Sequence, residues 1–234
     1  MFLNDSYRPI TDSAGFINCP AGECARQFMA WMEEIRPGAH KTRSCPAGAL
    51  STHLSSLCPL VKGGITREVF VPVQEDWTAY FDNGWRGTDS ASVLPVISTR
   101  LRCTALHVSC TPDLSRRGAK RYRARIVGIY RGAMRASRSL WVATDGGRWV
   151  AGSIGDPAAE EDQEWMTPVK VRDRFTDENL RTLVARFVPG VWDLARWLAA
   201  EAFLIERVGA LPSSFNEIDL ESVQESIPTR APKD

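Results

Sequence analysis

Four carboxylates flank or lie within an aromatic-rich stretch at residues 69–89: Glu75, Asp76, Asp82 and Asp89. Converging carboxylates can bind Mg²⁺ or serve as general acid and base, so a hydrolase or nuclease is one interpretation. Their spacing fits no metal-nuclease or glycosidase motif. Asp82 also begins Asp-Asn-Gly, a turn signal, because Asn and Gly adopt positive φ more readily than other residues. We favour the alternative in which Asp82 shapes a turn and the other carboxylates are solvated.

The same stretch continues into a glycine-punctuated loop that holds Trp85, Arg86, Thr88 and Asp89. Trp and Arg are frequent anchors of protein–protein interfaces. We therefore predict a partner-binding surface at this loop, with Asp82 at its base. Catalysis by the carboxylates is the second interpretation of the same residues.

Potential soft metal ligands gather near the N-terminus: Cys19, Cys24, His40, Cys45, His53 and Cys58. A structural zinc site needs four such ligands that converge as a tetrahedron. These residues form three pairs with four-residue gaps, whereas zinc knuckles usually have two-residue gaps. Cys is also a common small buried residue. We favour ordinary thiols over a zinc site, and we predict no metal and no cofactor.

Recognisable catalytic motifs are absent from the sequence, which has no phosphate loop and no GxGxxG, HExxH or GxSxG pattern. Cys103, His107 and Cys110 lie near one predicted strand. Side chains four residues apart on a strand are about 13 Å from each other, which excludes a local Cys103–His107 dyad. No catalytic residue is predicted, and the sequence favours a non-enzymatic protein.

Basic residues with Tyr122 among them form a run in the middle of the chain: Arg116, Arg117, Lys120, Arg121, Arg123 and Arg125. Such a run suits an anion or single-stranded nucleic acid, through phosphate pairing and stacking on the ring. The other interpretation pairs it with acidic residues of the same chain. We favour this pairing, because the near-zero net charge argues against a dedicated nucleic-acid binder.

Charge is distributed unevenly along the chain, although its formal net charge is only +1. Residues 100–148 carry 12 basic and 2 acidic side chains, whereas residues 149–234 carry 9 basic and 16 acidic ones. The chain is 44% hydrophobic and 24% charged, which is typical of a globular protein. We find no signal-peptide pattern and no run of about 18 apolar residues, so we expect a cytoplasmic protein with reduced cysteines and no membrane span.

Apolar periodicity predicts helices near both ends of the chain and strands between them. Helices are expected at residues 23–35, 48–57, 90–102, 177–187 and 191–208. Strands are expected at residues 69–73, 77–81, 104–110, 122–130, 139–143, 148–151 and 169–171. Because the strands do not alternate with helices, we predict an α+β fold whose central, mostly antiparallel sheet is flanked by N-terminal and C-terminal helices.

Three regions are expected along the chain. Residues 1–62 form an N-terminal helical region packed on the main domain, and Gly63-Gly64 marks the joint. Residues 63–211 form the α+β core with its C-terminal helices, and residues 212–234 form an acidic, Pro-rich tail. The sequence indicates no oligomeric state.

The strings WTAYFDNG (77–84), GTD (87–89), DGGRW (145–149) and DRFT (173–176) resemble a group of bacterial proteins of unassigned function. The resemblance spans about residues 69–187 and transfers no catalytic residue. The group is similar to small proteins without enzyme motifs that act as immunity or accessory partners in bacterial conflict systems. The resemblance therefore implies a protein-binding module, with a toxin as a candidate partner.

Overall fold

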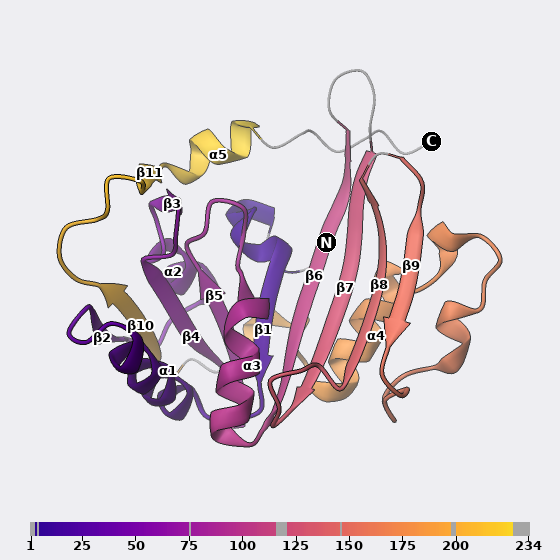
Figure 1. Cartoon of the computed structure of the whole chain (residues 1–234), viewed down its shortest axis with the longest axis horizontal. Coiled ribbons are helices and arrows are strands. Elements are labelled where there is room, and N and C mark those ends of the chain that lie inside the picture. Colours follow the sequence, from indigo (N-terminus) through magenta and orange to yellow (C-terminus); the bar gives the residue numbers. More distant parts are fainter. Residues whose placement is uncertain are drawn as a thin grey trace.

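A computed structural model describes residues 3, 5–74, 76–115, 121–145, 147–197 and 200–226. Its main sheet contains β1 (Ser13–Ile17), β2 (His40–Cys45), β4 (Arg67–Gln74), β5 (Trp77–Asp82), β6 (Thr104–Ser115), β7 (Arg121–Arg131), β8 (Arg138–Asp145), β9 (Val150–Ile154) and β10 (Ala202–Arg207). These nine strands lie in the order β2-β10-β4-β5-β1-β6-β7-β8-β9, and each neighbouring pair is antiparallel (Figure 1). The two short strands β3 (Leu60–Lys62) and β11 (Asn216–Ile218) form a separate antiparallel pair. The predicted α+β class and antiparallel sheet are confirmed.

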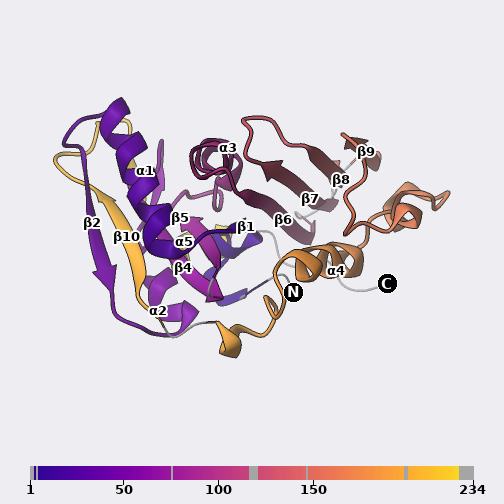
Figure 2. The ribbon, with the colours of Figure 1, turned by 90° about the horizontal axis from the view of Figure 1, so that it is seen from below.

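Helices lie on both faces of the main sheet (Figures 1 and 2). On one face, called the front face, lie α1 (Ala21–Ile35) and α3 (Ser90–Leu101). On the other, the back face, lie α2 (Leu50–Ser55) and α4 (Asp177–Phe187), and α5 (Leu220–Ser226) follows β11. The short 3₁₀ helices are η1 (Asp5–Tyr7), η2 (Ile10–Asp12), η3 (Gln163–Met166), η4 (Val171–Asp173) and η5 (Leu194–Arg196).

Each face of the sheet has its own apolar core, because successive strand side chains point to opposite faces. On the front face, Phe28 of α1 packs against Phe70 and Tyr80, with ring centroids 5.5 and 6.4 Å apart. On the back face, the buried side chains of α4 belong to one cluster with Val127 and Ile129 of β7. The sheet is therefore the central layer between two cores.

Four predicted helices are confirmed within a few residues at their ends, including the one expected at 48–57, which is α2. The helix expected at 23–35 is α1, and the one expected at 90–102 is α3. The helix expected at 177–187 is α4, whose N-cap Thr176 accepts a hydrogen bond from the Asn179 backbone N–H at 3.2 Å. Pro95 lies in the second turn of α3 rather than the first, so one intrahelical hydrogen bond is missing there.

The predicted long helix at 191–208 is wrong. The structure has only the short η5 there, followed by the strand β10, which lies between β2 and β4. Ala202, Leu204 and Ile205 are fully buried in this position. A short apolar run fits either a helix or a strand, and pairing on both edges decides for the strand. The strand expected at 169–171 is also wrong, since η4 begins at Val171.

Strands were not expected before residue 60, yet β1 and β2 both join the main sheet. β1 lies between β5 and β6, at the middle of the sheet, where its five residues are all buried. The region 1–62 was expected to be helical, but it contributes the strands β1, β2 and β3 as well as α1 and α2 to the fold. Residues 216–226 of the expected tail form β11 and α5.

Helices cover the front face unevenly (Figures 1 and 2). α1 and α3 lie over the part of the sheet from β2 to the near end of β7, and no helix of the described residues lies over β8 and β9 on that side. The loop after β7 lies on the front side of the sheet. Its Gly132 N–H donates to Cys103 O at 3.1 Å, and its Ala136 packs on the front core. Among the described residues, no helix is long and apolar enough to cross a membrane.

Candidate functional site

The loop between β5 and α3 is held by side chains that bond to its own backbone. Asp82 accepts the Gly84 N–H at 2.9 Å through Oδ1 and the Asp89 N–H at 2.7 Å through Oδ2. Thr88 donates to Ile10 O at 3.0 Å, which ties the loop to the N-terminal segment. Asp82 shapes the start of the loop as predicted, but the positive φ expected at Asn83-Gly84 is found instead at Gly87, where φ is +103°.

The predicted partner-binding residues of this loop divide into two groups. Asp82 is 0% exposed and Thr88 is 5% exposed, so these two build the loop and cannot contact a partner in this conformation. Arg86 and Asp89 are exposed. Trp85 is half-buried, and its ring lies 5.4 Å from Lys62 Nζ and 4.9 Å from the Arg86 guanidinium. The loop thus offers a smaller contact surface than its sequence indicates.

Carboxyl groups do converge near Asp82, but they are buried. Glu68 lies directly opposite Asp82 on the neighbouring strand, and Tyr80 donates to Asp82 Oδ2 at 3.4 Å. Burial raises the pKa of Asp82 to about 7, against the lowering effect of its two backbone N–H donors. Burial, with Asp82 next to it, raises the pKa of Glu68 well above its usual value. A perturbed pKa is common at functional sites, yet both side chains are closed off from solvent here. Of the other predicted carboxylates, Asp76 is exposed and Glu75 lies outside the described residues.

One serine–histidine contact was missed by the sequence reasoning. Ser90 Oγ, at the start of α3, lies 2.8 Å from His107 Nδ1 of β6. Burial lowers the pKa of His107, and the nearby Asp89 opposes that shift. Ser90 is fully buried over Gly15 of β1, where an added Cβ would lie 3.0 Å from the serine Cβ. A nucleophile must reach its substrate, so this closed contact positions α3 on the sheet rather than forming an open dyad.

The potential zinc ligands do not gather into one site. No group of three or more His, Cys, Asp or Glu residues within the described ranges is placed to hold a metal ion. Cys24 donates to Cys19 O at 3.5 Å, whereas His53 is buried in α2 and bonds through neither ring nitrogen. Burial lowers the pKa of His53 and raises the pKa of Cys24. All six cysteines are free thiols.

The predicted anion-binding run is only partly described by the structure. Arg116, Arg117 and Lys120 lie outside the described residues, as does the side chain of Arg121. Arg123 pairs with Asp177 of α4 at 2.5 Å. Arg131 and Arg138 likewise pair with acidic residues after 149, namely Glu160 at 3.4 Å and Glu161 at 2.5 Å. The prediction that basic and acidic parts of the chain pair with each other is confirmed for these arginines.

Beyond α3, the front surface of β6 to β9 has no described helix over it and exposes apolar side chains. We call it the open face, and it consists of Ser109, Thr111, Ala124, Ile126, Trp141, Ala143, Val150, Gly152 and Ile154. These side chains carry no charge. Val150 is 50% exposed and Ile154 is 63% exposed, while Ile126 and Trp141 are half-buried. Exposed apolar side chains grouped on one face are typical of an interaction surface.

Trp141 lies flat across this face, and Gly152 makes that position available. A Cβ added to Gly152 would lie 2.2 Å from Cζ2 of the Trp141 ring. Gly152 is directly opposite Trp141 in the register of β8 and β9. A glycine in a strand often marks close approach by another group, and here the group is the indole. The aromatic ring is therefore presented near the middle of the open face.

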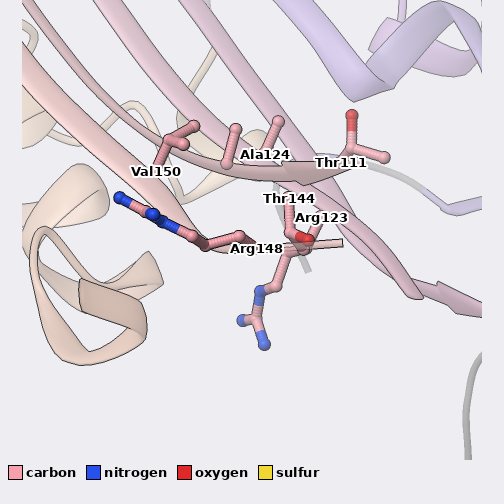
Figure 3. A pocket seen from close by; sticks show the side chains of 7 residues that line it. Thr111, Arg123, Ala124, Thr144, Arg148 and Val150 are labelled. Carbon is pink, nitrogen blue, oxygen red and sulfur yellow. The ribbon is translucent and has the colours of Figure 1, made fainter. Parts of the chain in front are cut away.

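One end of the open face contains a cavity of about 450 Å³. Its floor is a cross-strand row that runs from Thr111 through Ala124 and Ala143 to Val150. Figure 3 shows Thr111, Ala124 and Val150 projecting from the same side of the strands, with Arg123 on the other side. The exposed Arg148 also lines the cavity.

Comparison with known proteins adds no assignment, since no protein-family model, curated protein or solved structure matches the chain. The open face is itself a surface that the sequence reasoning did not predict. Alternation does place Ala124, Ile126 and Gly128 on one face of a strand. It does not say that α4 covers the opposite face of β7 and leaves this one uncovered.

Proposed function

We propose that this protein is a non-enzymatic protein-binding module that receives its partner on the open face. The observation that carries the proposal is Trp141, which lies across Gly152 among the exposed side chains of Val150 and Ile154. Aromatic side chains surrounded by smaller apolar contacts are typical interface anchors. The flanking helices, α1 and α3 on the front and α4 on the back, leave this one surface free for contact.

The border of the open face indicates the charge of the partner. Arg102 follows α3, Arg135 lies in the loop after β7, and Arg148 precedes β9. All three are exposed, and none forms an ion pair within the described part of the chain. A partner with an apolar centre and an acidic border would complement this arrangement. Long-range attraction by these arginines would also speed the encounter.

An immunity role is the specific form of this proposal, in which the partner is a bacterial toxin that the module neutralises. It draws support from the motif resemblance and from the lack of an accessible catalytic constellation among the described residues. The competing hydrolase or nuclease role needs carboxylates that substrate can reach. Asp82 and Glu68 are 0% and 6% exposed, so the geometry favours binding over catalysis.

The test is co-purification with the product of each neighbouring reading frame, using wild type, Ile126→Arg and Val169→Arg. Ile126 lies in β7, one of the two inner strands of the open face, whereas Val169 is 93% exposed between η3 and η4. Both variants place an arginine at an exposed or half-exposed apolar position. We expect Ile126→Arg to lose the partner and Val169→Arg to retain it.

Circular dichroism of both variants serves as the folding control. If Ile126→Arg binds the captured partner as well as the wild type does, the open face is not the binding surface. Hydrolysis of a nucleic acid or a small ester that is lost in Asp82→Asn would instead favour the enzymatic interpretation.

A further inference from the structure

The strand β9 ends the main sheet among the described residues, and no described strand pairs with its outer edge. Its sequence is Val-Ala-Gly-Ser-Ile, without any charged residue or proline. Val150, Ser153 and Ile154 are exposed. An edge strand leaves alternate N–H and C=O groups unpaired, and natural proteins usually protect such edges with charge or proline. β9 has neither protection.

The sequence of β9 is self-complementary in an antiparallel register. A two-fold axis at Gly152 places Val150 of one copy opposite Ile154 of the other, twice, on the open face. On the back face the same axis places Ala151 opposite Ser153. Apolar cross-strand pairs stabilise an antiparallel sheet, and no like charges meet within this register.

Charges just beyond the strand fit the same axis. Arg148 lies two residues before β9 and Asp156 two residues after it. Both are exposed, and neither forms an ion pair within the described ranges. The axis at Gly152 brings the Arg148 end of one copy near the Asp156 end of the other on both sides, and the chain bends out of strand geometry at Gly155, where φ is +82°. A net charge of only +1 adds little general repulsion between copies.

From these observations we infer that β9 pairs with β9 of a second copy of this chain, forming a symmetric dimer with a continuous eighteen-stranded sheet. The contact is isologous, because the same five residues serve both partners. The two open faces would then join at the axis, with the Gly152 positions at the centre and a Trp141 ring on each side. This dimer does not depend on the proposed protein-binding role, which concerns the face rather than the edge.

The decisive experiment is sedimentation velocity on charge variants across a micromolar concentration series. Arg148→Glu brings two carboxylates together across the axis, and Asp156→Arg brings two guanidinium groups together. We expect each single variant to weaken the dimer by about tenfold or more. The double variant Arg148→Glu/Asp156→Arg exchanges the charges on both sides, so it should restore dimerisation close to the wild-type level.

Mixing the two single variants supplies a second readout, because the introduced carboxylate of one variant then faces the introduced guanidinium of the other. On the second side of the axis, the unchanged Asp156 and Arg148 face each other. The mixture should form a heterodimer although each variant alone is largely monomeric.

An apolar variant tests the strand itself. Ile154→Lys should abolish the dimer, whereas Thr42→Lys, the matched change on the exposed edge strand β2, should not. The inference would be overturned by any of three results: the wild type stays monomeric, Ile154→Lys still dimerises, or the double charge exchange fails to restore the dimer.

Discussion

At one end of the main sheet, β2 carries Lys41 and Arg43 on its exposed strand, and both lie within 4 Å of Glu206 on β10. At the other end, β9 has no charged residue. The strands near β2 are also covered by α1 and α2, whereas no helix of the described ranges lies in front of β8 and β9 (Figure 2). One end is thus built to remain closed and the other to make contacts. The proposed binding surface lies at the end that the described helices leave free.

The covered half should depend most strongly on its packing. Phe28 is 1% exposed and its ring contacts those of Trp31, Phe70 and Tyr80. We expect Phe28→Ala to lower the free energy of unfolding by about 3–5 kcal/mol, because it leaves a cavity between α1 and the sheet. Chemical denaturation measures this loss. A loss below about 1 kcal/mol would contradict the assignment of this cluster as the front core.

Buried carboxyls in the same half should make stability depend on pH. Because the pKa values of Glu68 and Asp82 are raised in the folded protein, both groups prefer to be protonated there. As pH rises from about 4 to about 7, the unfolded chain ionises first and stability falls. Glu68→Gln should reduce this decline by roughly 1 kcal/mol per pH unit. Denaturation of both proteins at several pH values measures the two slopes, and identical slopes would refute the prediction.

In this covered half, the sequence predicted some of the helices and strands and missed others. Periodicity predicted α1 and α3 because their apolar stripes repeat at helical spacing. The N-cap type of Thr176 and the acidic Asp177 and Glu178 after it predicted the start of α4. β10 was missed because its short apolar run gains strand geometry only from β2 and β4, which are distant in sequence. The Ser90–His107 contact is likewise created by tertiary packing. Local sequence patterns therefore predicted the helices α1, α3 and α4. The strand β10 and the Ser90–His107 contact depend on segments that are distant in sequence, so local patterns could not predict them.

The candidate site shows the same division. The role of Asp82 was correctly predicted because an aspartate often bonds the backbone two residues on, whereas the left-handed residue is Gly87 and not Asn83 or Gly84. The open face could not be recognised, since Ile126 and Trp141 have the composition of ordinary core positions. Their exposure follows from where α4 packs and where α3 ends. To predict such a surface, one must know which helices cover each face of the sheet as well as which side chains alternate along the strands.

The uncovered half should tolerate a large truncation that the covered half does not. Trp141 is half-buried, so Trp141→Ala should lower the free energy of unfolding by only about 1–2 kcal/mol, despite removing a larger side chain than Phe28→Ala. Denaturation of the two variants side by side compares the halves directly. An equal loss in both would show that Trp141 belongs to the core rather than to a surface.

The most direct test of binding at the open face compares Trp141→Ala with Trp85→Ala. The affinity of each variant for the captured partner is measured by isothermal titration. Both changes remove one half-buried indole, but Trp141 lies on the open face and Trp85 lies between Lys62 and Arg86. If the open face is the binding surface, Trp141→Ala should weaken binding by about thirtyfold or more, and Trp85→Ala by less than about threefold. The reverse order would place the partner on the loop after β5 and contradict the account.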